Sequence, residues 1–431
     1  YYTGAELPQV YRKNQQTDWF QQPVSLEVGK TPANPWGLYD MHGNVEEWCY
    51  DWYGQYVTGV QYDPVGRADG IFRVSRGGSH GTAVFFLRSA NRMAAPPTDK
   101  HWMTGFRVVM ADMPESEPLP EDARPLNMQD VSPEDYHWPA ITDMNQPYFE
   151  GPQSFYEPPG PTRYPEDWPN SHASTITWCP NGDLLMCWVT NLGWRNTYTI
   201  ASRLRRGQDS WEPASVFFYP PDRDGSGGAF VNDGNGKIFY MRGISASAKW
   251  ATLAAMVRSS VNNGGNWSKP ELVYPEHGDG RFYHAHFGFQ AANGDLIMVG
   301  DGGYLDEEGS FIHISEDGGQ SWYNPGYGTA MPDFTEGGTG GRIAGIHAAV
   351  VERNDGSFMA FGRKNNINGQ MPMSVSSDRG FSWRYSASEF PPLHGGQRPV
   401  MLRLNEGPIV LFSFSNPGIV VEDAIGKQRL I

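Results

Sequence analysis

Residues 315–322 read SEDGGQSW, and related octapeptides occur at 260–267 (SVNNGGNW) and at 376–383 (SSDRGFSW). The three share the pattern Ser-x-(Asp/Asn)-x-Gly-x-(Ser/Asn)-Trp, and a looser version of it ends at Trp211. The four tryptophans, at positions 211, 267, 322 and 383, are separated by 56, 55 and 61 residues. A repeat of this length predicts a stacked or radial array of similar structural units.

Each repeat also carries a hairpin signal. Short alternating strands such as those in FGFQAANGDLIMVG are joined through Asn-Gly or Asp-Gly turns, with turn glycines at 182, 236, 294, 356 and 407. Two β-type runs joined in this way predict a β-hairpin. A hairpin, a third strand, the octapeptide turn and a fourth strand make up one propeller blade. Within the octapeptide we expect Asp or Asn to accept backbone N–H groups, Gly to supply a positive φ, and Trp to pack between blades.

The composition restricts the classes of partner. The chain has 431 residues and a net charge of −15, which argues against nucleic acid or an anionic membrane. No run of about 18 apolar residues is present, so no membrane span is predicted. An aromatic content of 13 % with few charged residues is typical of an extracellular or periplasmic protein that stacks sugars. The chain opens YYTGAEL without Met, so we interpret it as a fragment or processed form.

The chain divides into three regions by composition. Residues 1–112 are rich in Gly, Trp and Tyr, whereas residues 113–160 are dense in Pro and acidic residues and have linker composition. The hairpin repeats occupy residues 161–431. The chain has three cysteines, too few for a disulfide framework, and we expect Cys179 and Cys187 to be free, buried thiols.

Positions at the same phase of separate blades predict a shared site. The innermost strand of every blade in a propeller starts at one mouth of a central funnel. Counting nine or ten residues back from each turn glycine places these starts at His172, Gly227, His284, His347 and Arg398. Counting seven forward, to where the second strand returns to that mouth, reaches Asp301 and Arg363, and His286 and Tyr304 lie nearby.

The residue types at this mouth suggest roles. We assign acid–base chemistry to His172 and His347, because imidazole titrates near neutral pH. We expect His284, Asp301 and Arg398 to line the funnel and to contact a substrate. A metal ion in the funnel is the less favoured alternative, because the histidine spacings match no local metal-binding motif.

The octapeptide resembles the Asp box, or BNR repeat, of the sialidase (neuraminidase) superfamily, and the resemblance covers residues 160–431. It implies a six-bladed propeller of which about five blades are present, and we expect the last blade beyond Ile431. Sialidases hold the substrate carboxylate with three arginines, since a planar guanidinium binds carboxylate in a bidentate manner. The resemblance carries two of these arginines over to Arg363 and Arg429.

Other family positions differ. The first family arginine falls on His172, and the family glutamate falls on His347. The loop VTNLGWRNTY (189–198) contains no Asp, so the usual acid is missing, and the family tyrosine is expected past the end of the chain. The resemblance therefore implies binding of an acidic sugar but leaves ordinary sialidase catalysis in doubt.

The head of the chain resembles a second family. NPWGLYDMHGNVEEWCYDWYG (34–54), RVSRGGSHGTAVFFLRSANR (73–92) and GFRVVM (105–110) follow the order of the C-terminal half of the formylglycine-generating enzymes, or sulfatase-modifying factors. The resemblance implies a calcium site whose ligands would be Asp40, Gly43, Val45 and Glu47, and oxygen ligands suit Ca²⁺. The family's copper-binding cysteines are absent from GTAVFFL (81–87), so we expect no copper and no oxidase chemistry.

These observations predict a mainly β chain in which an irregular α+β head precedes a sialidase-like propeller. The leading function is a secreted exo-glycosidase acting on terminal, acidic sugars of a glycan. A polysaccharide lyase or a non-sialic glycoside hydrolase on the same propeller is the first alternative. A non-catalytic glycan-binding protein is the rival from another class, and a sulfatase maturation factor is disfavoured by the missing cysteines.

Overall fold

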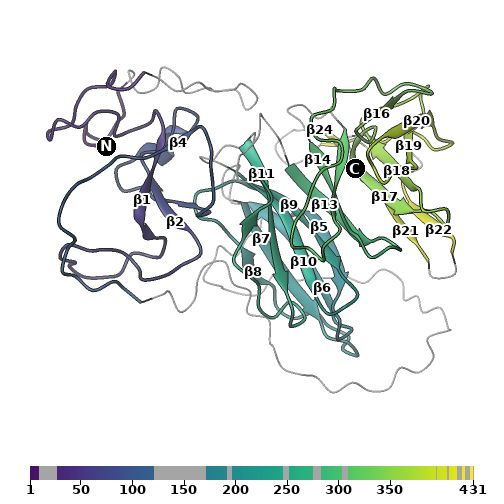
Figure 1. Cartoon of the computed structure of the whole chain (residues 1–431), viewed down its shortest axis with the longest axis horizontal. Helices are drawn as coiled ribbons and strands as arrows, with labels where there is room; N and C mark the ends of the chain where they lie inside the picture. Colours follow the sequence, from purple (N-terminus) through teal and green to yellow (C-terminus); the bar gives the residue numbers. More distant parts are fainter. Residues whose placement is uncertain are drawn as a thin grey trace.

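The computed structural model describes residues 1–8, 27–120, 171–191, 197–245, 252–274, 283–302, 309–394, 396–404, 407–414, 420–422 and 428–430. Figure 1 shows the head on one side of a larger array of β-sheets. Regular structure in these ranges consists of β-strands and one short 3-10 helix. None of the described helices is long and apolar enough to cross a membrane. The expected linker falls mostly on 121–160, outside the described residues.

The head is built on one small sheet with strand order β3-β2-β1-β4. Its strands are β1 (Glu46–Trp52), β2 (Arg73–Arg76), β3 (Met93–Ala95) and β4 (Thr104–Gly105), and η2 (Val84–Leu87) is the 3-10 helix. No α-helix occurs in residues 1–8 or 27–120, so the helical part of the expected α+β make-up is absent there. One physical reason is that Gly77 and Gly78 both have positive φ, which ends β2 in a turn that no α-helix can continue.

The propeller sheets follow in chain order (Figure 1). The first contains β5 (His172–Trp178), β6 (Leu184–Asn191), β7 (Thr197–Leu204) and β8 (Ser215–Phe218); the second contains β9 (Gly225–Asn232), β10 (Ile238–Ser245), β11 (Leu253–Ser260) and β12 (Glu271–Leu272). The third contains β13 (Tyr283–Gln290), β14 (Leu296–Gly302) and β15 (Ser310–Ser315).

The fourth sheet contains β16 (Thr339–Gly340), β17 (Ile346–Glu352), β18 (Phe358–Arg363), β19 (Pro372–Ser376) and β20 (Trp383–Ala387). Two pairs remain, β21 (Val400–Arg403) with β22 (Ile409–Phe412) and β23 (Val420–Glu422) with β24 (Gln428–Leu430). The expected four strands are found in the first two sheets. The third has three strands, and the fourth has five because β16 pairs with β20.

The first strands of successive sheets face one another. β5 lies against β9, β9 against β13, β13 and β14 against β17, and β17 against β21. Each of β5, β9, β13 and β17 also contains a register shift against its hairpin partner. A bulge of this kind inserts an extra residue, bends the strand and redirects side chains. The inner ends of neighbouring blades are therefore irregular at corresponding places.

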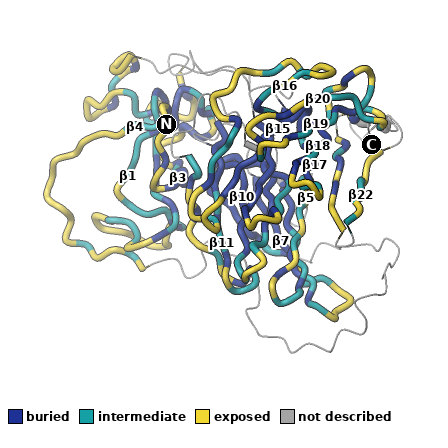
Figure 2. Tube along the Cα trace, turned by 45° about the vertical axis from the view of Figure 1, so that its right-hand side comes forward, coloured by how far each residue is buried: buried dark blue, intermediate teal, exposed yellow. Residues whose placement is uncertain are grey.

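The octapeptides form the turns that their sequence predicts. Asp317 accepts the backbone N–H groups of Gln320 (3.0 Å) and Ser321 (2.9 Å), and Gly319 has φ of +84°. The side chains of Trp267, Trp322 and Trp383 pack into cores that include residues of the preceding sheet. Figure 2 shows that buried residues concentrate along the strands of these sheets. The structural role expected of the octapeptide is confirmed.

The head packs directly on the propeller. Phe72 and Ala94 of the head share one hydrophobic core with Phe217 and Phe218 of the first sheet. Next to this core, the guanidinium of Arg223 donates to the carboxylate of Glu46, to Ser75 Oγ (3.2 Å) and to the carbonyl of Ala94 (2.8 Å). The Arg223 and Glu46 side chains are only 1 % and 0 % exposed. The interface thus combines apolar packing with a buried ion pair.

Candidate functional site

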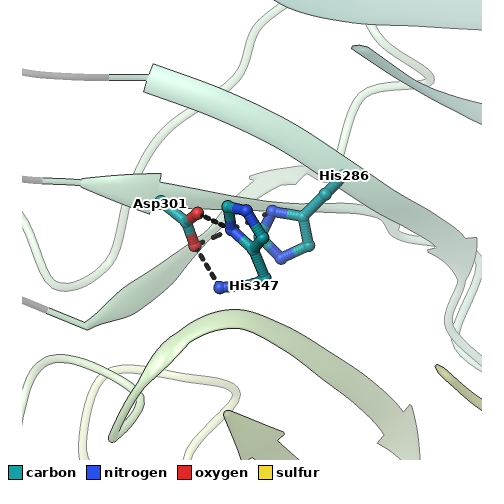
Figure 3. A group of neighbouring side chains, drawn as sticks. All are labelled: His286, Asp301 and His347. Carbon is teal, nitrogen blue, oxygen red and sulfur yellow. Dashed lines mark hydrogen bonds and ion pairs between the residues drawn. The ribbon is translucent and has the colours of Figure 1, made fainter. Parts of the chain in front are cut away.

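Three ionisable side chains meet where the third and fourth sheets adjoin (Figure 3). They are His286 on β13, Asp301 on β14 and His347 on β17. One nitrogen or oxygen atom from each lies within 4.8 Å of the corresponding atoms of the other two. The side chains of His286 and Asp301 are 1 % and 4 % exposed, whereas that of His347 is 17 % exposed. His347 is therefore the member of the group that faces solvent most.

Asp301 holds His347 through two contacts. Its Oδ1 accepts the backbone N–H of His347 at 2.6 Å, and its Oδ2 contacts the imidazole Nδ1. His347 has φ of +52°, a conformation that a non-glycine residue adopts only when its surroundings stabilise it. The carboxylate therefore fixes both the backbone and the ring of His347, and leaves Nε2 of that ring directed away from Asp301.

His286, on β13, is oriented by the backbone of β17, the strand that carries His347. Its Nε2 lies 3.0 Å from the carbonyl oxygen of Ala348, and its Nδ1 lies 3.8 Å from Asp301 Oδ1. The rings of His286 and His347 are 5.5 Å apart between centroids. A carbonyl oxygen can only accept a hydrogen bond, so Nε2 of His286 carries the proton. This contact orients the ring with Nδ1 toward Asp301.

Ser310, on β15, supports the group from behind. Its hydroxyl lies 2.8 Å from Asp301 Oδ1 and 2.9 Å from the carbonyl of Gly345, and it accepts the N–H of Ala348 at 3.2 Å. Ser310 is fully buried. One side chain thereby connects the carboxylate with the bulged segment of β17 that carries His347.

Two arginines lie beside this group, at the ends of neighbouring strands. Arg363 pairs across the hairpin with Ile346, the residue before His347, and its Nη1 donates to the carbonyl of Gln397 at 3.1 Å. Arg398 follows Gln397 directly. Burial lowers the pKa of Arg398 to about 10, and its buried Nη2 has no hydrogen-bond partner among the described residues. A desolvated guanidinium without a counter-charge is unfavourable unless an anion arrives.

Bulges explain why these particular side chains meet. The register of β13 against β14 shifts between Ala285 and Phe287, so His286 is the extra residue. The register of β17 against β18 shifts between Ile346 and Ala349, a span that contains His347. Since a bulge re-aims side chains at the rim of a sheet, both imidazoles turn toward the boundary between the two sheets.

The structure brings together only part of the expected site. Asp301 and His347 meet, and Arg363 and Arg398 lie next to them through Ile346 and Gln397. His172 is exposed at the start of β5, in the first sheet, and is not part of the three-residue group. The acid–base roles expected of His172 and His347 stay predictions.

Two further expected contacts concern side chains outside the described set. The backbone of His284 pairs with Asp301, and that of Arg429 pairs with Val421, but neither side chain is described. Their expected roles stay predictions.

Ser310 was not predicted from the sequence, and His286 was placed near the mouth but given no role. His286 lies two residues after His284, so in a regular strand both would face the same side, and counting from the turn glycine selects His284. The bulge at His286 breaks the alternation of side-chain directions, so His286 turns to another side. No residue type in YHAHFGF (283–289) predicts a bulge at this position.

The residues expected to bind calcium lie in the head. Asp40 accepts the N–H of Gly29 at 2.6 Å and contacts Thr31 Oγ1 at 2.7 Å, while the carboxylate of Glu47 pairs with Arg107 at 2.7 Å. Gly43 donates to Gly77, and Val45 lies between the two acidic residues. Both carboxylates thus have protein partners, and the calcium site stays a prediction.

The head also contains the segment where the related enzymes carry copper-binding cysteines. Residues 81–87 contain none. Cys49 is a free thiol on β1, and burial raises its pKa to about 11, so it is protonated at neutral pH. Cys179 and Cys187 are free and buried, as expected.

Comparisons with known proteins agree with both resemblances. The model of the BNR repeat-like domain matches residues 193–422, and that of the sulfatase-modifying factor enzyme 1-like domain matches residues 3–112. The two family resemblances inferred from the octapeptides and from the head motifs are confirmed. The fold is mainly β, with a sialidase-like propeller after the head.

Curated relatives match short stretches. A serine/threonine-protein kinase (pkn1) of Chlamydia caviae is 48 % identical over 80 residues, which are 18 % of this chain and 13 % of the kinase. A formylglycine-generating enzyme of Thermomonospora curvata is 38 % identical over 88 residues, 19 % of this chain and 29 % of that enzyme. The chain spans less than a third of the length of these relatives.

Among solved structures, a Hadza microbial sialidase is similar with a TM-score of 0.42 and 15 % identity. The similarity covers 56 % of this chain and 52 % of the sialidase.

Proposed function

The chain belongs to the BNR repeat-like domain family, and from this premise we propose that its propeller is a glycan-active enzyme that cleaves a terminal sugar carrying a negatively charged group. We place the protein in the extracellular or periplasmic space, where such glycans are degraded. The sugar would bind at the mouth formed by the ends of β17, β18 and β21.

The observation that carries this proposal is the environment of the Arg398 guanidinium. The guanidinium is desolvated, and its Nη2 has no partner among the described residues. Arg363 adds a second positive charge next to Gln397. A carboxylate or sulfate can accept two parallel hydrogen bonds from a guanidinium and would neutralise it. The acidic group of the sugar supplies such an anion.

His347 is the polar side chain that we place against the bond to be broken. It directly follows Ile346, which pairs with Arg363 across the hairpin. Its side chain is partly exposed, and Asp301 fixes its orientation. A side chain held in place in this way can stabilise the charge that develops in a transition state, because no free energy is spent on reorienting it.

A polysaccharide lyase is the second candidate. The described group contains one carboxylate, Asp301, which is already bonded to His347. Most glycosidases use a pair of Asp or Glu residues, whereas an elimination requires that the sugar carboxylate be neutralised, as Arg363 and Arg398 would do. The product distinguishes the two reactions, because only elimination leaves an unsaturated uronate.

The test is an assay of the chain against sialylated, sulfated and uronate-rich glycans, following both reducing sugar and the ultraviolet absorbance of unsaturated uronate. We expect release from one acidic class and a loss of about 100-fold or more in rate for His347→Ala, as when a preorganised polar group is removed. His394→Ala removes an exposed imidazole outside the group and is the matched control.

Binding is measured in parallel by calorimetry on the same glycans. Glycan binding without release by the wild type would replace the enzyme by a glycan-binding protein. Release that His347→Ala retains at the wild-type rate would remove His347 from the reaction.

A further inference from the structure

We propose that His286, Asp301 and His347 bind a divalent transition-metal ion such as Zn²⁺ at the boundary between the third and fourth sheets. Each contributes one atom to a set whose members all lie within 4.8 Å of one another (Figure 3). Two imidazoles and one carboxylate form a donor set that suits Zn²⁺ and the neighbouring first-row ions. The ligands come from three strands, β13, β14 and β17, so no local spacing in the sequence reveals the site.

The tautomer of His286 is the strongest argument for a cation. Its Nε2 donates to the carbonyl of Ala348, so in the neutral ring Nδ1 carries a lone pair. That lone pair faces Asp301 Oδ1 across 3.8 Å. The nitrogen and the carboxylate oxygen can therefore both act as electron-pair donors to one cation. Two ligand atoms around a tetrahedral Zn²⁺ lie about 3.4 Å apart, because each bond is about 2.0–2.1 Å long.

Neighbouring groups orient the ligands in the way that metal sites require. Ser310 Oγ holds Asp301 Oδ1 at 2.8 Å, and the carbonyl of Ala348 holds the far nitrogen of His286 at 3.0 Å. Outer hydrogen bonds of this kind define the tautomer and the direction of a ligand. These outer bonds preorganise Asp301 and His286, whereas Nδ1 of His347 contacts Asp301 Oδ2 and would exchange that contact for the ion.

Three protein ligands leave one tetrahedral position open. The His347 side chain is 17 % exposed, compared with 1 % for His286 and 4 % for Asp301, so solvent reaches the group from the side of His347. A water molecule or a ligand oxygen would occupy this position, as in zinc sites with three protein ligands.

This inference does not depend on the proposed glycan cleavage. The two are nonetheless compatible in charge, since an ion at this place would add positive charge to that of Arg363 and Arg398. Metal binding is measured without any glycan, and its result therefore stands whether or not the chain cleaves sugars.

The experiment titrates the chelator-treated protein with Zn²⁺ by calorimetry and with Co²⁺ by visible absorption. We expect one ion per chain and the d–d bands of a tetrahedral nitrogen and oxygen site. His286→Ala and His347→Ala should each weaken binding by about 100-fold or more, because losing a ligand costs more than the 10–100-fold of losing an outer-shell partner. Ser310→Ala keeps all three ligands and should weaken binding by about 10-fold.

His394→Ala is the control for adventitious binding, since it removes an exposed imidazole outside the group. It should bind like the wild type, and circular dichroism of every variant checks that the sheets are intact. Absence of binding by the folded wild type would overturn the proposal. Equal affinities for the wild type and His286→Ala would assign binding to surface imidazoles and would overturn it as well.

Discussion

Two groups of charged residues in this molecule differ in how their charges are neutralised. At the interface between head and propeller, Arg223 donates to Glu46, Ser75 and Ala94, and the charges cancel within the protein. At the mouth of the propeller, Arg398 is desolvated and its Nη2 has no partner among the described residues. The first arrangement pairs its charges within the protein, whereas no described residue pairs with Nη2 of Arg398 in the second.

The difference separates stability from function. A buried ion pair is costly to break, because removal of one partner leaves an uncompensated charge in a medium of low polarity. A desolvated charge without a counter-charge lowers the stability of the folded protein. Such charges occur at functional sites, where a bound ligand can neutralise them. Substitution should therefore lower the free energy of unfolding at Arg223 but not at Arg398.

The largest expected effect is that of Arg223→Met. The substitution leaves Glu46 as a buried carboxylate without its cation, so the free energy of unfolding should fall by about 3–5 kcal/mol. Urea denaturation followed by tryptophan fluorescence measures this change. The double variant Glu46→Gln/Arg223→Met should recover a large part of the loss. A double variant as unstable as the single one would show that packing, and not the unpaired charge, causes the effect.

The opposite result is expected for Arg398→Met. This variant removes a desolvated charge, so the free energy of unfolding should stay equal or rise. Affinity for the acidic glycan should fall by about 10- to 100-fold, since a hydrogen bond to a charged group contributes about 1.5–3 kcal/mol. Calorimetry with the glycan and urea denaturation measure the two quantities. A marked loss of stability would mean that Arg398 has a structural partner, and the contrast with Arg223 would then disappear.

The smallest effect is expected at an exposed charge with good hydrogen bonds. Bonds from the Ser321 hydroxyl and backbone lower the pKa of Asp317 to about 2, below its value of about 3.9 in an unfolded chain. A depressed pKa in the folded state stabilises above pH 4, and this contribution is lost as the pH falls from about 4 to about 2. Because Asp317 is exposed, we expect less than about 1 kcal/mol.

The measurement compares the wild type with Asp317→Asn by urea denaturation at pH 2.5 and pH 6. The difference between the two proteins should be smaller at pH 2.5, where the carboxyl of the wild type is partly protonated. A difference that is the same at both pH values would show that the charge of Asp317 does not contribute.

Much of the fold could be predicted from the sequence, but only part of the site. The octapeptide turn depends on contacts between residues two to four positions apart, such as Ser315 with Asp317 and Asp317 with Ser321, so the pattern alone is sufficient. Asp301, His347, Arg363 and Arg398 were found by counting from turn glycines, because hairpins preserve that count. His286 was placed near the mouth without a role, because the bulge that turns it toward Asp301 changes the count by one.

The sequence by itself determined the repeated blades, the turns between their strands and the absence of cysteines from residues 81–87. The physical reason is that hairpins and Asp-box turns are closed by hydrogen bonds within a few residues. Only the tertiary structure decided that Asp301 meets His347, 46 positions away, and that Glu46 meets Arg223, 177 positions away. Such contacts depend on how neighbouring sheets dock and where bulges turn the side chains, and no local pattern encodes either.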